Sequence, residues 1–139
     1  MKDNILSMLG LMRRASALAI GYDNTADGLN SGKVKLVLVP ADASEKRKKD
    51  VELALRGRNA ISVNLPYTAD ELAEAAGVSG CAVLGVKDLG FADSLLKKLA
   101  ETDEEYAGAY EELHRRNEKA KRRRNETRKY GKKNQREGE

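Results

Sequence analysis

Four short apolar runs, separated by segments with helical periodicity, constrain the fold of this chain more than any other feature of its sequence. The runs at residues 18–20, 34–39, 60–65 and 81–86 are predicted to be strands. We expect helices over residues 4–15 and 23–31, after Ser44, after Thr68 and along a stripe from Phe91 to Leu99. Because strands and helices alternate, we predict an α/β fold in which helices cover both faces of a central sheet of about four strands.

The apolar residues are concentrated before about Leu99, so residues 1–101 are predicted to be one domain with its own core. We expect that core to include Ile5, Leu9, Val37, Val39, Val63, Val83 and Leu96. Residues 102–139 form a charged tail, in which residues 102–113 hold five acidic residues and no basic one. The tail is rich in helix-forming residues, and we expect a helix through about Arg124 with disorder beyond it.

Positive charge is concentrated at the end of this tail. Residues 114–139 hold 12 Lys and Arg against four Glu, which gives +8, whereas the whole chain carries +4. A concentrated basic segment indicates a polyanionic partner, most often RNA or DNA, although a solubilising extension is the simpler alternative. Arg122, Arg123 and Arg124 form its densest cluster and are candidate RNA contacts. A second basic cluster, at residues 46–49, is either a solvated helix face or a phosphate contact.

The chain lacks the sequence patterns of common catalytic and cofactor sites, with no GxGxxG, Walker loop, HExxH or GxSxG. His114 is the single histidine and is expected to be solvated, and the single cysteine, Cys81, is predicted to be a small buried hydrophobe in a reducing, cytoplasmic protein. We therefore expect no catalysis, no cofactor, no metal and no membrane partner. Asp88 follows the last predicted strand and is either a helix cap or a functional residue.

Several short motifs occur in an order and spacing that are more informative than any one of them. They are residues 9–16 (LGLMRRAS), Gly21, residues 31–39 (SGKVKLVLV), residues 41–44 (ADAS) and residues 85–92 (GVKDLGFA). Together they resemble the L-seven-Ae family of kink-turn-binding ribosomal proteins, in particular its small bacterial members. The resemblance covers about residues 4–100 and does not include the basic tail.

The resemblance implies a non-catalytic three-layer α/β/α sandwich that binds structured RNA, typically a kink turn, in the ribosome or translation apparatus. In that family the RNA is held by the loop and helix start after the first strand, with help from the loop after the last strand. Gly21 would let the backbone approach RNA, and the following helix start would present N–H groups to phosphate. Val86 and Lys87 would offer an apolar contact for an extruded base and a charge for the backbone. The candidate RNA-binding residues of the domain are Arg14, Gly21, Tyr22, Asp23, Asn24, Asp27, Val86 and Lys87.

The helix start departs from the family's usual pattern, Asn-Glu-x-x-Lys. Asp23, Asn24 and Asp27 occupy those positions, so an amide replaces the glutamate and an acid replaces the lysine. Ala17 also stands where relatives often have lysine. We expect weak recognition by this edge, with the basic tail supplying electrostatic affinity. Alternatively, Asp23 and Asp27 are ordinary acidic residues near a helix N-terminus, stabilised by the helix dipole.

Three functions remain open at this point. The first is an RNA-binding protein whose domain recognises shape and whose tail supplies salt-sensitive affinity. The second is a protein-interaction module, docked on ribosomal or translation proteins and tethered to RNA by its tail. The third is a small enzyme acting on a nucleotide or a phosphorylated substrate. Loss of the tail should remove much of the binding in the first two cases and leave turnover intact in the third.

Overall fold

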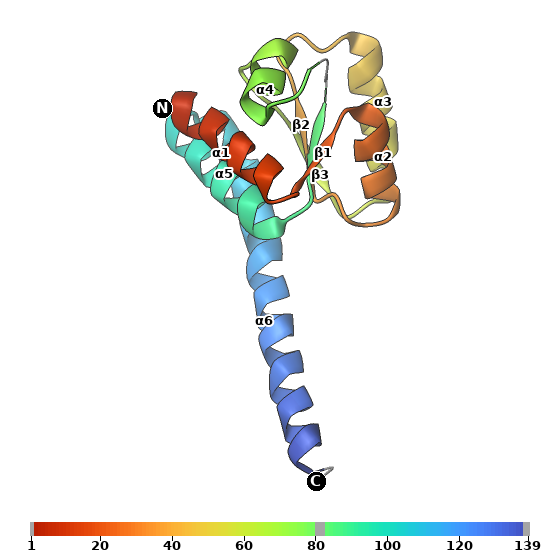
Figure 1. Cartoon of the computed structure of the whole chain (residues 1–139), viewed down its shortest axis with the longest axis vertical. Helices are drawn as coiled ribbons and strands as arrows, with labels where there is room; N and C mark the ends of the chain where they lie inside the picture. Colours follow the sequence, from red (N-terminus) through yellow and green to blue (C-terminus); the bar gives the residue numbers. More distant parts are fainter. Residues whose placement is uncertain (1, 80–82, 138–139) are drawn as a thin grey trace.

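Six α-helices, a short 3-10 helix and four strands make up the described chain (Figure 1). The computed structural model describes the backbone of residues 2–79 and 83–137 and the side chains of residues 4–79 and 83–126. The elements are α1 (Lys2–Arg14), β1 (Leu18–Ile20), α2 (Tyr22–Asn30), β2 (Leu36–Val39), α3 (Glu45–Leu55), β3 (Ile61–Asn64), α4 (Ala69–Ala76), β4 (Leu84–Val86), α5 (Leu89–Thr102), η1 (Glu104–Tyr106) and α6 (Ala107–Glu137). Cys81 lies outside the described residues, so its predicted burial stays a prediction.

The four strands form one mixed sheet in the order β1-β4-β2-β3. β4 pairs antiparallel with both of its neighbours, and β2 pairs parallel with β3. In this register Val86 lies opposite both Leu18 and Leu36. The end of β4 therefore lies beside the beginnings of β1 and β2, which decides where the loops at either end of the sheet meet.

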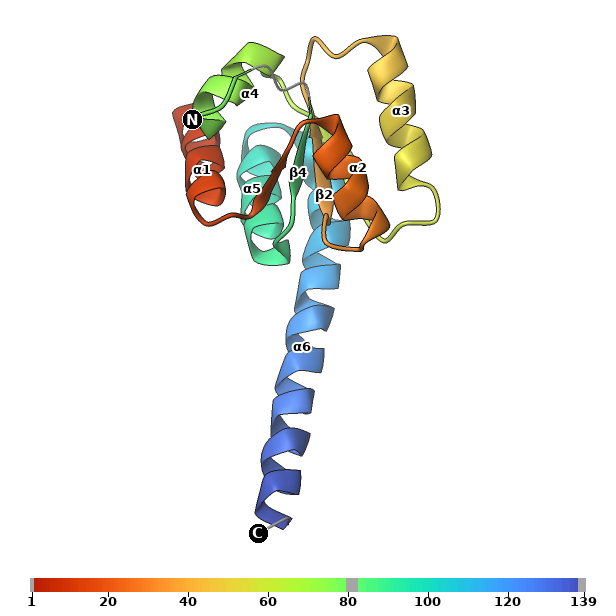
Figure 2. The ribbon, with the colours of Figure 1, turned by 45° about the vertical axis from the view of Figure 1, so that its right-hand side comes forward.

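The sheet is buried on both faces, as the apolar runs predicted. Leu36 and Leu38 belong to a large core formed with α1, α4, α5 and the beginning of α6. Val37 and Val39 point the other way, into a smaller core formed with α2 and α3. Successive residues of a strand face opposite sides, so both sides of β2 must be apolar. The expected three-layer α/β/α sandwich is confirmed, with the two helical layers on either side of the sheet in Figure 2. All seven predicted core residues are at most 8% exposed.

Three helices begin at side-chain caps that the sequence signals. The Thr68 hydroxyl accepts from the Glu71 amide while the Glu71 carboxylate accepts from the Thr68 amide, which completes the predicted capping box. Ser44 accepts from the amide of Arg47 at the start of α3. Asp88 accepts from the amide of Phe91 at 2.9 Å and so caps α5, which confirms the first of the two interpretations of this residue.

The packed part of the chain extends past the expected domain boundary at residue 101. The Tyr106 hydroxyl donates to the Asn64 carbonyl at the end of β3 over 2.6 Å, and burial raises the pKa of this phenol above its ordinary 10.0. Leu113 is fully buried against the larger core. The first three turns of α6 thus belong to the domain, and the rest of the helix projects away from it (Figure 1).

The helix runs on to Glu137, beyond the expected end near Arg124. Lys, Arg, Glu and Gln are good helix formers and fill most of this segment. Each weaker former, such as Gly131, costs at most about 1 kcal/mol in a helix interior. Packing of the first turns against the domain removes the cost of nucleating the helix, so elongation can continue through these residues.

The two-sided burial of β2 predicts a clear difference between two apolar truncations. Val37→Ala should lower the free energy of unfolding by at least about 1 kcal/mol, because it removes methyl groups from a fully buried site. Leu53→Ala on α3 is the control, since Leu53 is 57% exposed, and it should change stability by no more than about 0.5 kcal/mol. Urea unfolding of both variants measures this. Equal effects would contradict the burial of Val37.

Candidate nucleic-acid interface

The start of α2 depends on a backbone conformation that only glycine adopts readily. Gly21 has φ 84° and ψ 166°, and its amide donates to the Val83 carbonyl at 2.9 Å. Its carbonyl accepts from both the amide and the hydroxyl of Thr25, which is fully buried. No side chain of the described residues caps this helix. The first-turn N–H groups therefore have no side-chain acceptor among these residues, and a helix start of this kind can present such groups to an anion.

Tyr22 has a packing role in this structure. Its hydroxyl donates to the Asp50 carbonyl of α3 at 3.3 Å, and the Arg47 guanidinium lies 4.5 Å from its ring centre. Arg47 also lies 3.5 Å from the Asp50 carboxylate. These contacts join α2 to α3, so the ring is held between two helices. Part of the 46–49 cluster is therefore paired within α3, since Lys48 also lies 3.5 Å from the Glu45 carboxylate on the same helix.

Asn24 and Asp27 lie along a groove between β1 and α2. We call it the β1–α2 groove, and its lining includes Leu18, Ile20, Asn24, Asp27, Lys33 and Lys87. Asn24 donates to the Ile20 carbonyl at 2.8 Å, so its amide is held against the strand end. Asp23 and Asp27 are exposed. The groove thus has a carboxylate in its lining and basic side chains near the end of α2, an arrangement that repels a phosphate in one part and attracts it in another.

The strand register decides what the two candidate residues at the end of β4 contact. Val86 was expected to contact an extruded base, but this is wrong because Val86 is fully buried between Leu18 and Leu36. Lys87 was expected beside the edge that Gly21 and the helix start form. It lines the β1–α2 groove with Asn24 and Asp27, and its amide donates to the Ala17 carbonyl, before β1 begins. Antiparallel pairing places the end of β4 next to the start of β1, so Gly21 neighbours the beginning of β4 instead. Sequence alone does not give the direction of pairing.

Lys87 therefore lies at the opposite end of the β1–α2 groove from Gly21. Arg14 ends α1 three residues before Ala17, is exposed, and donates from Nε to the Gly10 carbonyl at 3.3 Å. Ala17 itself is buried, with its carbonyl engaged by Lys87. The candidate residues of the domain thus separate into a helix-start group around Gly21 and a basic group at the far end of the sheet.

The predicted tail arginines are exposed on α6. Arg123 and Arg124 line a hollow between α6 and the loops that lead into β2 and β3, which we call the α6 hollow. Its other basic residues are Lys35, Arg115, Arg116 and Lys119. The structure does not place Arg122 in this lining. The tail and the domain thus share one basic surface, which the sequence did not indicate.

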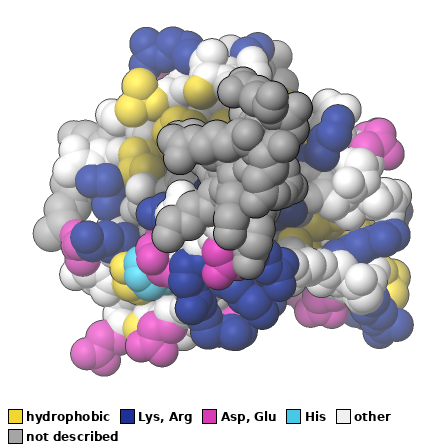
Figure 3. All heavy atoms as spheres, turned by 90° about the horizontal axis from the view of Figure 1, so that it is seen from below, with side chains coloured by type: hydrophobic (Ala, Val, Ile, Leu, Met, Phe, Trp, Pro, Cys, Tyr) yellow, Lys and Arg dark blue, Asp and Glu magenta, His cyan; other side chains and the backbone are white. Residues whose placement is uncertain are grey.

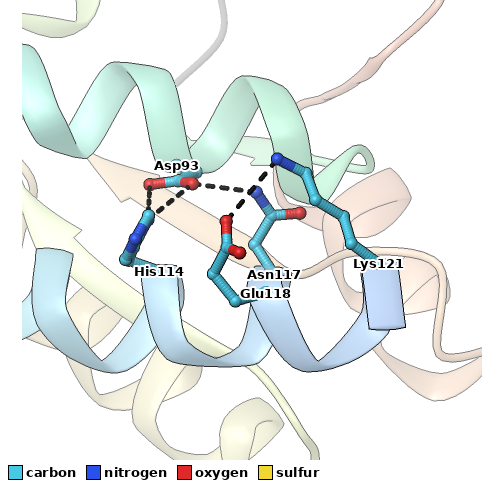
Figure 4. A network of polar contacts seen from close by, with 5 residues as sticks. All are labelled: Asp93, His114, Asn117, Glu118 and Lys121. Atoms are coloured by element: carbon cyan, nitrogen blue, oxygen red, sulfur yellow. Dashed lines mark hydrogen bonds and ion pairs between the residues drawn. The ribbon is translucent and has the colours of Figure 1, made fainter. Parts of the chain in front are cut away.

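A polar network that sequence reasoning missed fixes the direction of α6 (Figure 4). Asp93 on α5 contacts Nδ1 of His114 at 2.9 Å and accepts from the side-chain amide of Asn117 at 2.8 Å. Asn117 is 2% exposed, and the His114 ring lies 5.3 Å from that of Tyr110. The expectation of a solvated His114 is thus only half right, because its side chain is 44% exposed yet joined to α5. The sequence did contain a signal for this packing, since residues 110, 113, 114 and 117 follow the i, i+3, i+4, i+7 spacing of a packed helix face.

The described residues contain no group of three His, Cys, Asp or Glu side chains placed to hold a metal ion. Within the same part of the chain, no helix is long and apolar enough to cross a membrane.

Comparison with known proteins decides the family. Residues 3–96 match the model of the family described as "Ribosomal protein L7Ae/L30e/S12e/Gadd45 family". The chain belongs to this family. The match covers the whole sheet, the β1–α2 groove and helices α1 to α4, and it ends within α5, before α6 begins. Membership confirms the resemblance seen in the sequence motifs.

Two curated relatives are ribosomal proteins. The chain is 30% identical over 95 residues to the large ribosomal subunit protein eL30 of Neurospora crassa, and this match covers 67% of this chain and 86% of that protein. It is 40% identical over 50 residues to eL30B of Schizosaccharomyces pombe, and there the match spans 36% of this chain and only 43% of the relative's length.

Two solved structures share the fold. A Bacillus halodurans protein of unknown function superposes with a TM-score of 0.61 at 31% identity, over 66% of this chain and 91% of that one. The Giardia lamblia 15.5kD RNA binding protein superposes with a TM-score of 0.56 at 20% identity, over 78% of this chain and 85% of that one. At that identity the second likeness shows the fold alone.

The backbone of Gly21 predicts opposite effects for two glycine substitutions. Gly21→Ala should destabilise the domain by about 1–3 kcal/mol, because φ 84° with ψ 166° is strained for any residue with a Cβ, although open space surrounds that position. Gly108→Ala is the control, since Gly108 lies inside α6 with open space where a Cβ would project, and it should stabilise by up to about 1 kcal/mol. Thermal or urea unfolding distinguishes the two. A neutral Gly21→Ala would show that the start of α2 adopts another conformation.

Proposed function

We propose that this protein is a non-catalytic RNA-binding protein of the cytoplasmic translation apparatus, which recognises structured, kink-turn-like RNA through the start of α2. The observation that carries the proposal is the family match over residues 3–96, because it includes the β1–α2 edge on which the resemblance places RNA contact. The eL30 relatives are proteins of the large ribosomal subunit, and the Giardia neighbour is an RNA-binding protein. RNA, and through it ribosomal proteins, are the partners proposed for this chain.

The geometry of the α2 start supports this role. Gly21 brings the backbone to the surface without a side chain, and uncapped N–H groups follow it. Such a helix start attracts phosphate through its free amides and the helix dipole. Asp23 and Asp27 oppose that attraction on the same helix. This attraction and this repulsion together predict a site that recognises the shape of the RNA backbone and has low affinity for RNA by itself.

The projecting part of α6 supports a separate electrostatic contribution. From Asn117 to Glu137 the helix rises by about 30 Å at 1.5 Å per residue. Screening limits the reach of each charge to about 8 Å at physiological salt, so a basic arm must lie close to its partner to act. A helix that continues out of the domain can place these charges along an RNA helix next to the domain.

Deleting α6 beyond its packed part should test the electrostatic contribution. The deletion should begin at Arg122, because Leu113 and Asn117 are buried and an earlier cut would damage the domain. Residues 122–139 hold eight Lys and Arg and three Glu. Binding of full-length protein to structured RNA should weaken steeply with salt, and the truncated protein should show a flatter log–log slope, since each phosphate contact contributes about 0.9 on a duplex. Identical slopes would show that this segment does not touch RNA.

Two substitutions in the β1–α2 groove should test shape recognition. Asp27→Lys should strengthen kink-turn binding by on the order of 1 kcal/mol, or about fivefold, because it replaces a repulsive charge near phosphate by an attractive one. Adding Asn24→Glu should increase the preference for a kinked RNA over a plain duplex, since a carboxylate accepts from guanine or cytosine amino groups. Titration against a kink-turn RNA and a plain duplex of equal length measures both effects.

The matched control for this titration is Glu74→Lys, which makes the same change in charge at an exposed position of α4. It should leave the preference for kinked RNA unchanged. If neither substitution in the groove alters affinity or preference, the groove is not the RNA site. The interaction-module function would then be favoured.

A further inference from the structure

We propose that the α6 hollow is a second RNA-binding site, which takes the phosphate backbone of a helical RNA segment. This inference rests on the proposed function, because it names a second contact with the same class of partner. The hollow and the β1–α2 groove are separate places on the surface. The groove is formed by β1 and α2, whereas the hollow is formed by α6 and the loops before β2 and β3.

The charge of the hollow is strongly one-sided. Its lining brings together six basic side chains, from Lys35, Arg115, Arg116, Lys119, Arg123 and Arg124. A single carboxylate, that of Glu112, opposes them, so the formal charge of the lining is +5. Like charges at this density repel one another and lower the stability of the folded domain unless a polyanion lies among them. A concave surface with this balance is therefore suited to phosphate groups.

Two guanidinium groups in the hollow share the one carboxylate. Glu112 accepts from Arg115 Nη2 at 2.8 Å and from Arg116 Nε at 2.9 Å, and the Arg115 bond is the main reason that the pKa of Glu112 lies below its usual range. Among the described residues Arg116 Nη1 finds no acceptor although it is shielded from solvent. The carboxylate therefore orients both arginines without satisfying all their donors. The Arg115 side chain is 67% exposed in this arrangement, and an oriented guanidinium that stays open to the hollow is well suited to phosphate oxygens.

The hollow is part of a wider basic surface at one end of the sheet. Lys33 lines the β1–α2 groove and Lys35 lines the hollow, and between them Val34 is buried. Lys87 lies at the same end of the groove as Lys33. Figure 3 looks at this end of the domain, and Lys and Arg side chains gather around the base of α6 there. One RNA can thus contact the groove and the hollow together, on either side of the α2–β2 connection.

The chemistry of the hollow favours a phosphate backbone over a base or a nucleotide. Its apolar lining residues are Leu89 and Ala120, and it includes no aromatic ring on which a base could stack. Arg116, Lys119 and Arg123 follow one another about one turn apart along α6, so the row can meet more than one phosphate. Contacts of this kind position an RNA and carry no sequence preference.

The test compares two double variants that change the net charge equally. Lys35→Glu with Lys119→Glu alters the hollow. Lys97→Glu with Lys98→Glu alters exposed positions on α5, outside both proposed RNA contacts. Each pair takes the formal charge from +4 to 0. Binding to a plain 20-base-pair RNA duplex is measured by titration over a range of salt concentrations. Circular dichroism and thermal unfolding confirm that both variants retain the fold.

The hollow variant should bind the duplex at least about tenfold more weakly at low salt, with a log–log salt slope reduced by about 1.8 for two lost phosphate contacts. The α5 variant should retain the wild-type slope and stay within about twofold in affinity. Equal losses in both variants would show a general effect of net charge and overturn the proposal. An unchanged slope in the hollow variant would also overturn it and favour an acidic protein segment as the occupant.

The same variants separate this proposal from the proposed function. On a kink-turn RNA, the hollow variant should lose affinity yet keep the preference for kinked over plain RNA, because its contacts do not depend on sequence. If the groove variants gain the predicted preference for kinked RNA while the hollow variant keeps the wild-type slope, the hollow alone is refuted. If the wild-type protein shows no preference for kinked over plain RNA, but the hollow variant shows the reduced salt slope, kink-turn recognition alone is refuted.

A photocrosslinking experiment gives a second measurement that does not change any charge. A benzophenone amino acid replaces Ala120, which lines the hollow, or Ser7, which lines a separate depression between α1 and α4. Irradiation with labelled duplex RNA should yield a crosslink from position 120 and much less from position 7. A crosslink of equal yield from both positions, or from position 7 alone, would contradict RNA binding in the hollow.

Discussion

Burial of the sheet on both faces is the constraint on which the rest of this structure depends. Leu36 and Leu38 are covered by one layer of helices, and Val37 and Val39 are covered by the other. Because a strand with two apolar faces cannot be left open to water on either side, α2 and α3 must pack opposite α1, α4 and α5. This arrangement brings α2 alongside β1 and creates the groove that contains Asn24 and Asp27.

The attachment of α6 turns a basic segment into a surface with a defined shape. Leu113 provides apolar burial, and Asp93 holds His114 and Asn117 through hydrogen bonds in a partly buried setting. A freely moving tail with the same composition would also attract RNA, but it would lose more conformational entropy on binding. A docked helix places Arg115, Arg116 and Lys119 opposite Lys35 before any RNA arrives.

The two proposed RNA contacts have different physical roles. The start of α2 offers backbone amides in a fixed geometry, which can distinguish the shape of an RNA but carries little positive charge. The α6 hollow offers charge in a concave surface, which increases affinity without selecting a sequence. The family match covers the first contact and ends before α6, so the second contact lies partly outside the matched residues.

The sequence by itself determined the elements, the core and the family. Apolar periodicity located the strands and helices, the Thr68 cap is a local pattern, and the motifs around residues 9–16 and 31–39 identified the family, because these signals involve neighbouring residues. Only the tertiary structure decided that Val86 is buried, that Lys87 lies away from Gly21, and that Lys35 faces α6. Strand direction and register set these relations between distant residues, and local periodicity is the same for either direction of pairing.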